Sequence, residues 1–344
     1  AYISENLAWR YIKMTIDTSN KKYLDSYQYF VSKIQPEIMP FDNRLNVKLS
    51  NSPYVSELGL SKEYEIYFRA VQTQLQLYKK ENIPIQTELS EMSQKYGAIS
   101  GAQSIEYDGN EITIQKANLY LKDPEESKRI NVYKKIVDRK KQDFKKLDDL
   151  FSDLIKKRHQ LALNAGFENF RDYKFKSMGR FDYTMQDCFD FHDSVEKNIV
   201  PLVKKIQIEK LNKLNKTKFK PWDSSVDPEG RQALKPFKDV KELLSGTISM
   251  FNDIDSYFSD CIDSMDQMGH LDLDSKKGKS PGGYNYPLYE IGVPFIFMNA
   301  VGSHRDLITM IHEGGHAIHS FLTRDLKLTS FKDVPSEVAE LASM

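Results

Sequence analysis

The chain has 344 residues, of which 40% are hydrophobic and 28% are charged, so extensive disorder is excluded. Its 49 basic and 49 acidic side chains balance, and without a basic excess we expect no nucleic-acid partner. The two cysteines, Cys188 and Cys261, allow at most one disulfide, which excludes a disulfide-stapled scaffold and favours a reducing compartment, the cytoplasm. The most apolar stretch, residues 293–301, is too short to cross a bilayer, so no membrane partner is expected either.

The first 220 residues predict a helical N-terminal region that contains one β-hairpin. Two short runs rich in strand-forming residues, 104–107 and 111–114, flank the Asp-Gly-Asn sequence at 108–110. A short Gly-containing turn between two such runs is typical of a hairpin.

Residues 124–165 follow one long amphipathic helical pattern. Asp123 suits the N-cap, Pro124 suits the first helical position, and Gly166 suits the stop. This region is locally basic, and we interpret the charge as a solvated helix face.

A loop with Pro, Asp and Gly at 221–236 is a candidate boundary, after which a second region, residues 221–344, begins. Within it, residues 294–298 (Pro-Phe-Ile-Phe-Met) predict a short buried strand that follows a Pro-Gly-Gly turn at 281–283.

The strongest chemical signal is the sequence His-Glu-Gly-Gly-His at 312–316, a match to the His-Glu-x-x-His pattern. On a helix, His312 and His316 lie one turn apart on the same face, where two imidazoles can share one tetrahedral Zn²⁺. Glu313 would flank the ion as a general base without binding it. Ser303 and Asp306 have the spacing of a capping box and predict where this helix begins.

Two glycines inside this helix, Gly314 and Gly315, cost roughly 1 kcal/mol each relative to alanine, so we expect their missing side chains to serve a purpose. Either a backbone lies close to the helix, from the substrate or from the strand at 294–298, or another helix packs closely against it.

A catalytic zinc site needs a third protein ligand. The metzincin pattern is excluded, because His319 stands where it needs Gly and Leu322 where it needs His. Ser336 can cap a further helix, on which Glu337 and Glu340 lie one turn apart. Either carboxylate could complete the site, and the spacing alone does not decide between them.

These motifs identify a resemblance to the oligoendopeptidase F branch of the thimet-oligopeptidase-like zinc peptidases. It rests on KSPGGYNYPLYEIGVPFIFMNAVGSHRDLITMIHEGGHAIHSF and PSEVAELASM, and it extends over most of residues 100–344. In that family the third ligand is a Glu followed by two residues and a Ser, a pattern that Glu340 fits and Glu337 does not. The resemblance therefore implies His312, His316 and Glu340 as metal ligands, with Glu337 as the second choice.

The resemblance also implies a mainly α fold, in which two helical halves surround a deep channel and a zincin-type catalytic core holds a small β-sheet. Residues 1–220 would form the helical N-terminal region and residues 221–344 the zinc catalytic region. Family members continue beyond the position of Met344, and their further segment supplies residues that stabilise the oxyanion. We therefore expect the catalytic region to be truncated at its C-terminal end.

The predicted function is that of a zinc metalloendopeptidase with one Zn²⁺ per chain, which hydrolyses internal bonds of short unfolded oligopeptides. Zinc lowers the pKa of a bound water to about 7, and Glu313 would accept the proton that this water releases. One alternative is a catalytically incomplete, peptide-binding relative of the same fold, and another is a zinc hydrolase with a different substrate. Two histidines and a carboxylate also suit Fe(II), Mn²⁺ or Co²⁺.

Overall fold

The computed structural model describes residues 1–58 and 62–344. As predicted, the chain is mainly helical with small sheets. The helices are α1 (Tyr2–Ile16), α2 (Lys21–Tyr29), α3 (Gln35–Ser50), α4 (Val55–Leu58), α5 (Lys62–Leu77), α6 (Asn82–Gly101), α7 (Ile114–Leu119), α8 (Glu126–Gln142), α9 (Phe144–Asn164), α10 (Phe170–Ser177), α11 (Met185–Ser194), α12 (Val200–Lys213), α13 (Val240–Ile254), α14 (Ser256–Gln267), α15 (His304–Thr323) and α16 (Ser336–Ala342). The strands are β1 (Ser104–Tyr107), β2 (Asn110–Thr113), β3 (Leu271–Asp274), β4 (Tyr284–Tyr286) and β5 (Phe295–Ala300).

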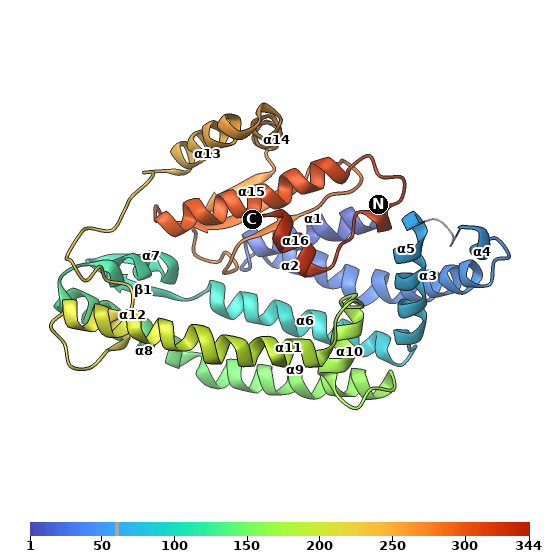
Figure 1. Ribbon diagram of the computed structural model, residues 1–344, viewed down its shortest axis with the longest axis horizontal. Helices are drawn as coiled ribbons and strands as arrows, with labels where there is room; N and C mark the ends of the chain where they lie inside the picture. The colour runs from blue at the N-terminus through green and yellow to red at the C-terminus, as the bar shows by residue number, and fades with distance from the viewer. Residues whose placement is uncertain (59–61) are drawn as a thin grey trace.

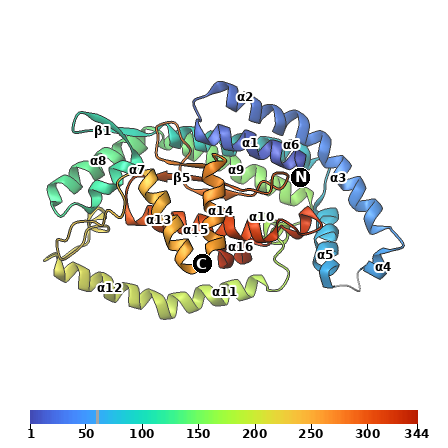
Figure 2. The same cartoon turned by 90° about the horizontal axis from the view of Figure 1, so that it is seen from above.

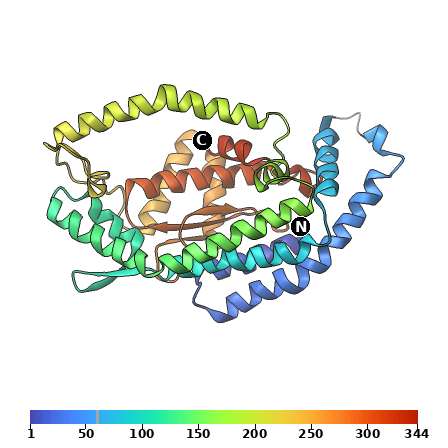
Figure 3. The ribbon, with the colours of Figure 1, turned by 90° about the horizontal axis from the view of Figure 1, so that it is seen from below.

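Earlier helices of the chain lie around the C-terminal helices α13 to α16. Figure 1 shows α13 to α16 above a layer of long helices that includes α6, α8, α9, α11 and α12. From above and from below, α15 lies between α1 and α2 on one side and the rod of α11 and α12 on the other (Figures 2 and 3). No helix within the described ranges is long and apolar enough to span a bilayer.

A three-stranded sheet lies beside α15, with the strand order β3-β5-β4. The central strand β5 pairs in parallel with β3 and antiparallel with β4, and it confirms the strand predicted around 294–298. Because side chains alternate along a strand, Ile296 and Met298 join the core with α13 to α15, whereas Phe295 and Phe297 pack on α1. The sheet is thus covered on both faces, and β4 forms one of its edges.

The predicted hairpin is also present. Strands β1 and β2 pair antiparallel, with Ser104 opposite Thr113 and Tyr107 opposite Asn110. The turn residues Asp108 and Gly109 both have positive φ, at 50° and 73°, which is the conformation that short hairpin turns of this kind require.

The prediction of one long helix over 124–165 is wrong. Helix α8 ends at Gln142 and α9 begins at Phe144, because Asp143 leaves the helical conformation and turns its carboxylate inward. That carboxylate accepts hydrogen bonds from Arg139 at 2.6 Å and from Gln103 at 3.1 Å. Neither Gly nor Pro stands at the break, and the helical spacing of apolar residues continues across it. The sequence pattern therefore does not show where α8 ends.

Of the two predicted ends of this segment, the N-terminal one is wrong and the C-terminal one is confirmed. The N-cap is Glu125 and not Asp123, whose carboxylate accepts from the Glu125 amide. At the other end, Gly166 follows the C-cap with φ +85°, and the amide of Phe167 bonds the carbonyl of Ala162. This is the glycine stop that the sequence predicts.

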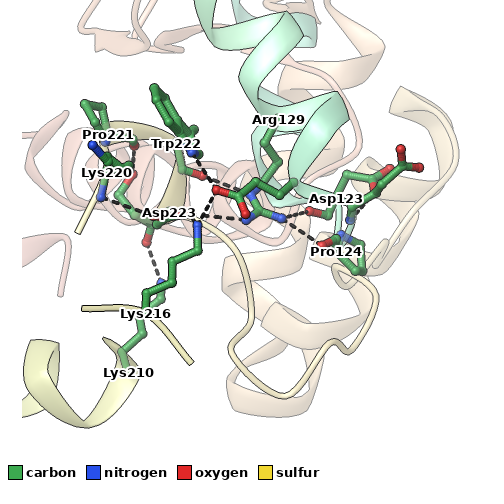
Figure 4. A network of polar contacts seen from close by, with 12 residues as sticks. Asp123, Pro124, Arg129, Lys210, Lys216, Lys220, Pro221, Trp222 and Asp223 are labelled. Atoms are coloured by element: carbon green, nitrogen blue, oxygen red, sulfur yellow. Dashed lines mark hydrogen bonds and ion pairs between the residues drawn. The ribbon is translucent and has the colours of Figure 1, made fainter. Parts of the chain in front are cut away.

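One basic side chain of this region is not on a solvated face. The guanidinium of Arg129 is buried and donates to the backbone carbonyls of Asp123, Pro124 and Trp222 and, at 3.2 Å, to the carboxylate of Asp223 (Figure 4). Lys216 also donates to Asp223, at 2.7 Å. Since these buried charges are hydrogen-bonded and paired, they hold the loop that follows α12 against the start of α8.

Candidate metal centre

Helix α15 begins where the capping box predicts. The hydroxyl of Ser303 accepts from the amide of Asp306 at 3.2 Å, and the carboxylate of Asp306 accepts from the amide of Ser303 at 2.8 Å. These two bonds satisfy amides that the first turn would otherwise leave without partners. The start of the helix is therefore fixed locally, and with it the face on which His312 and His316 lie.

The two histidines face a hollow of about 520 Å³ that lies between α15, α16 and the segment containing β4. Their ring centroids are 4.7 Å apart and the rings are nearly perpendicular. Burial, and then the neighbouring His312, lower the pKa of His316. Its imidazole is therefore held in the neutral form, which is the form that binds metal ions.

The third side chain at this point is Glu340 of α16. One of its carboxylate oxygens lies 3.3 Å from Nε2 of His312, and the other lies 3.8 Å from Nε2 of His316. Ligands of a tetrahedral ion at about 2.0–2.1 Å are about 3.3 Å from one another, so little movement would be needed for all three to bind it. The ligand atoms of His312, His316 and Glu340 all lie within 4.8 Å of one another, and this donor set fits zinc.

Glu337, the second choice from the sequence, has other partners. Its carboxylate accepts a hydrogen bond of 2.6 Å from the Tyr183 hydroxyl and pairs with Nε of Arg180, also at 2.6 Å. The Tyr183 hydroxyl, first, and then the Arg180 charge lower the pKa of Glu337. The structure thus brings Glu340 to the two histidines and joins Glu337 to the segment between α10 and α11.

Ser343 connects the end of α16 to the first histidine. Its hydroxyl donates to the carbonyl of Glu340 at 2.8 Å and lies 3.1 Å from Nδ1 of His312. With its own proton used in this way, the hydroxyl oxygen can accept the Nδ1 proton of His312. That tautomer leaves Nε2, the atom nearest Glu340, free to bind a metal.

The two glycines of the motif meet different neighbours. A Cβ on Gly314 would lie 2.7 Å from the ring of Phe251 in α13, and one on Gly315 would lie 2.8 Å from Cα of Ser343. Gly314 therefore fits close helix packing, whereas Gly315 leaves room for a backbone, that of Ser343 at the end of α16; the strand at 294–298 is not among their nearest neighbours. Gly315 lets the end of α16 approach α15.

Glu313 lies next to the group of three and points toward the edge strand. It is only 7% exposed, and burial, the largest effect, raises its pKa, although His312 and the backbone amide of Asn285 act in the opposite direction. Gly283, directly before β4, lies beside this carboxylate, since a Cβ there would be 3.7 Å from it, an ordinary van der Waals distance. A buried carboxylate with a raised pKa is better matched to proton transfer near neutral pH than an ordinary one.

Several residues around this group were not predicted from the sequence. Asn285 lines the hollow beside Glu313, and Arg180 and Tyr183 hold α16 from a segment some 150 residues earlier in the chain. His319, which its spacing of three residues from His316 places near the same helix face, lines the same hollow outside the group of three. The contacts of Asn285, Arg180 and Tyr183 have no local sequence signal, except that Tyr284, Asn285 and Tyr286 alternate as an edge strand would.

Comparisons with known proteins show the family of the chain. The sequence profile of Peptidase family M3 matches residues 119–344, and that of the Peptidase M3 N-terminal domain matches residues 1–78. The chain therefore belongs to peptidase family M3.

Its relatives include several oligopeptidases. It is 37% identical over 73 residues to the chromosomal oligoendopeptidase F of Lactococcus lactis subsp. cremoris, a match that covers 21% of this chain and 12% of that protein. It is 36% identical over 73 residues to oligopeptidase PepF of Bacillus subtilis, covering 21% and 11%. The match to oligopeptidase A of Escherichia coli is longer, at 24% identity over 249 residues, and covers 56% of this chain and 36% of that protein.

Solved structures show the same fold. A Bacillus anthracis protein assigned as an oligoendopeptidase F superposes with a TM-score of 0.91 at 23% identity, covering 97% of this chain and 61% of that one. PZ peptidase A, solved with an inhibitor, also gives a TM-score of 0.91, at 24% identity and with 97% and 59% coverage. The chain thus spans about 60% of the length of these structures.

Proposed function

We propose that this protein is a zinc metalloendopeptidase, which binds one Zn²⁺ per chain through His312, His316 and Glu340 and cleaves internal bonds of short unfolded peptides. The proposal rests chiefly on one observation, the convergence of three ligand atoms within 4.8 Å beside a buried carboxylate. Membership of a peptidase family supports a peptide as the substrate. The unpaired thiols of Cys188 and Cys261 fit a reducing compartment, and we place the protein in the cytoplasm.

A zinc ion held by His312, His316 and Glu340 would act as a Lewis acid toward the peptide carbonyl and would lower the pKa of a water molecule toward neutrality. Glu313 takes the proton from that water as the oxygen attacks the carbonyl carbon. It then gives the proton to the amine as the C–N bond breaks. Ser343 keeps His312 in the tautomer that the site needs, and the buried position of Glu313 keeps its pKa above the ordinary value.

The edge strand beside the site suits an extended peptide. Strand β4 pairs with β5 along one side only, and no strand of the described residues pairs with its other side. An extended peptide can add to such an edge through backbone hydrogen bonds that do not depend on its sequence. Because the amide of Asn285 in β4 faces Glu313, a peptide on this edge would pass beside the proposed base.

The test is to measure zinc content and turnover together for the wild type, Glu313→Gln and His316→Ala. A quenched fluorogenic peptide of about eight residues and casein serve as the substrates. We expect Glu313→Gln to keep zinc and to lose about 10²-fold or more of its turnover, whereas His316→Ala loses zinc. Cleavage of casein would contradict the restriction to short peptides. A wild type that holds zinc but cleaves neither substrate would contradict the enzyme proposal and favour a peptide-binding protein.

A further inference from the structure

A second hollow opens on the α1 side of the edge strand. It has a volume of about 390 Å³ and is lined by Leu7, Tyr11, Tyr27, Tyr284, Asn285 and Tyr286, and we call it the tyrosine hollow. Tyr284 and Asn285 also line the hollow that holds the candidate metal centre. The two hollows therefore meet at β4, one on each side of it.

Aromatic rings form most of the walls. The ring centroid of Tyr11 lies 6.0 Å from that of Tyr27, 5.7 Å from that of Tyr284 and 5.8 Å from that of Tyr286. Burial raises the pKa of Tyr27 to about 12 and also raises the pKa values of Tyr11 and Tyr286, so these phenols stay neutral at physiological pH. Among the residues that the structure describes, no charged side chain lines the tyrosine hollow.

Strand geometry relates this hollow to a bound peptide. Tyr284 and Tyr286 point to the same face of the sheet, where both pack against α1. Residues that lie directly opposite each other on neighbouring strands also point to the same face. The side chains of a peptide paired with β4, at the positions opposite Tyr284 and Tyr286, would therefore enter the tyrosine hollow. Side chains between them would face α15 and Glu313.

We propose that the tyrosine hollow is a specificity subsite, which binds an aromatic or large aliphatic side chain of the peptide within one or two residues of the cleaved bond. This inference rests on the proposed function. Aromatic walls stabilise a buried apolar side chain, because apolar surface is removed from water and because rings pack favourably against one another. A charged side chain would lose its hydration there without finding an opposite charge.

The test compares peptides of about eight residues that differ at one position, where an alanine host sequence carries Phe, Leu, Lys or Ala. With the natural full-length protein, we expect one position at which Phe or Leu raises kcat/KM about tenfold or more over Ala. Leu7→Trp fills the hollow, so the ratio of kcat/KM for the Phe or Leu peptide to kcat/KM for the Ala peptide should come close to one. Tyr2→Trp is the matched control, because Tyr2 lies on the same helix and is 71% exposed, and it should keep the ratio. Zinc content and thermal unfolding establish that both variants are folded.

A binding measurement separates this inference from the proposed function. Fluorescence anisotropy of labelled peptides on Glu313→Gln reports affinity without turnover. We expect the Phe peptide to bind more tightly than the Ala peptide, and the double variant with Leu7→Trp to bind both equally. A wild type that cleaves no peptide would overturn the proposed function while this comparison still decides the subsite. Equal binding of the two peptides, a preference for Lys, or a preference that Leu7→Trp leaves unchanged would overturn the subsite.

Discussion

Helix α15 and the segment 329–344 each contribute to the candidate metal centre, but different forces hold them in place. Helix α15 is 20 residues long, has a capping box and places six of its residues in the interior. Helix α16 is 7 residues long, has no side-chain cap and has no buried residue. The two histidines are therefore positioned by their own helix, whereas Glu340 depends on contacts that come from elsewhere in the chain.

Those contacts come from several directions. Tyr183 and Arg180 hold Glu337, the Tyr289 hydroxyl donates to Asp333 at 2.8 Å, and the ring of Phe331 packs edge-on against Tyr64. The contact between Gly315 and Ser343 brings the end of α16 against α15. A weak helix is thus positioned by tertiary contacts, and the site should be most sensitive where those contacts are closest.

Among substitutions that leave the three proposed ligands and Glu313 in place, the largest effect is expected from Gly315→Ala. Its new Cβ would lie 2.8 Å from Cα and 2.9 Å from the carbonyl oxygen of Ser343, so α16 must move away and take Glu340 with it. We expect zinc affinity, measured by competition with a chromogenic chelator, to fall about 10²-fold. Gly246→Ala in α13 is the control, because a Cβ there meets nothing within 4 Å, and it should stabilise the protein by about 0.5–1 kcal/mol. Equal zinc affinity in the two variants would show that α16 does not depend on this contact.

A smaller loss is expected from Ser343→Ala. Without the hydroxyl, Nδ1 of His312 loses the partner that selects its tautomer, and we expect zinc affinity to fall about tenfold without unfolding. Ser264→Ala serves as the control, since that hydroxyl also donates to a helix carbonyl but is exposed and does not line the hollow. If both serine variants bind zinc as the wild type does, His312 is oriented by its helix alone.

The smallest effect concerns stability and its dependence on pH. The pKa of Glu313 is raised in the folded state, so this residue stabilises the fold below its unfolded pKa of about 4.5 and that contribution is lost as pH rises. In urea unfolding of the metal-free protein, Glu313→Gln should therefore be more stable than the wild type at pH 7, with the difference vanishing toward pH 4.

For Glu337 we expect the opposite dependence of stability on pH. Its pKa is lowered in the folded state, so its contribution is present above the unfolded value and is lost as pH falls. Glu337→Gln should be less stable than the wild type at pH 7, and the difference should shrink in acid. If both variants are more stable than the wild type at pH 7, or both are less stable, the environments described for Glu313 and Glu337 would be contradicted.

The sequence was informative where structure is decided locally. The capping box at Ser303, the one-turn spacing of the histidines and the hairpin turn at Asp108 each follow from a few neighbouring residues, and all are present. The choice between Glu337 and Glu340 was open from spacing alone, because it depends on Arg180 and Tyr183, about 150 residues away.

The helix break was missed for the same reason. Asp143 ends α8 because its carboxylate accepts a hydrogen bond from Gln103, a residue 40 positions earlier, and no local pattern shows that contact. The tyrosine hollow likewise joins α1 and β4, which lie at opposite ends of the sequence. The division into regions 1–220 and 221–344 stays a prediction.

The most direct test of the central claim is the zinc content of Glu340→Ala and Glu337→Ala, measured by mass spectrometry after loading with one equivalent of zinc and dialysis. The two substitutions remove the same group from positions one turn apart on one helix. We predict that Glu340→Ala retains almost no zinc, whereas Glu337→Ala, which loses one of several contacts that hold α16 but no ligand, retains most of it. Retention of zinc by Glu340→Ala together with its loss from Glu337→Ala would contradict the proposed ligand set.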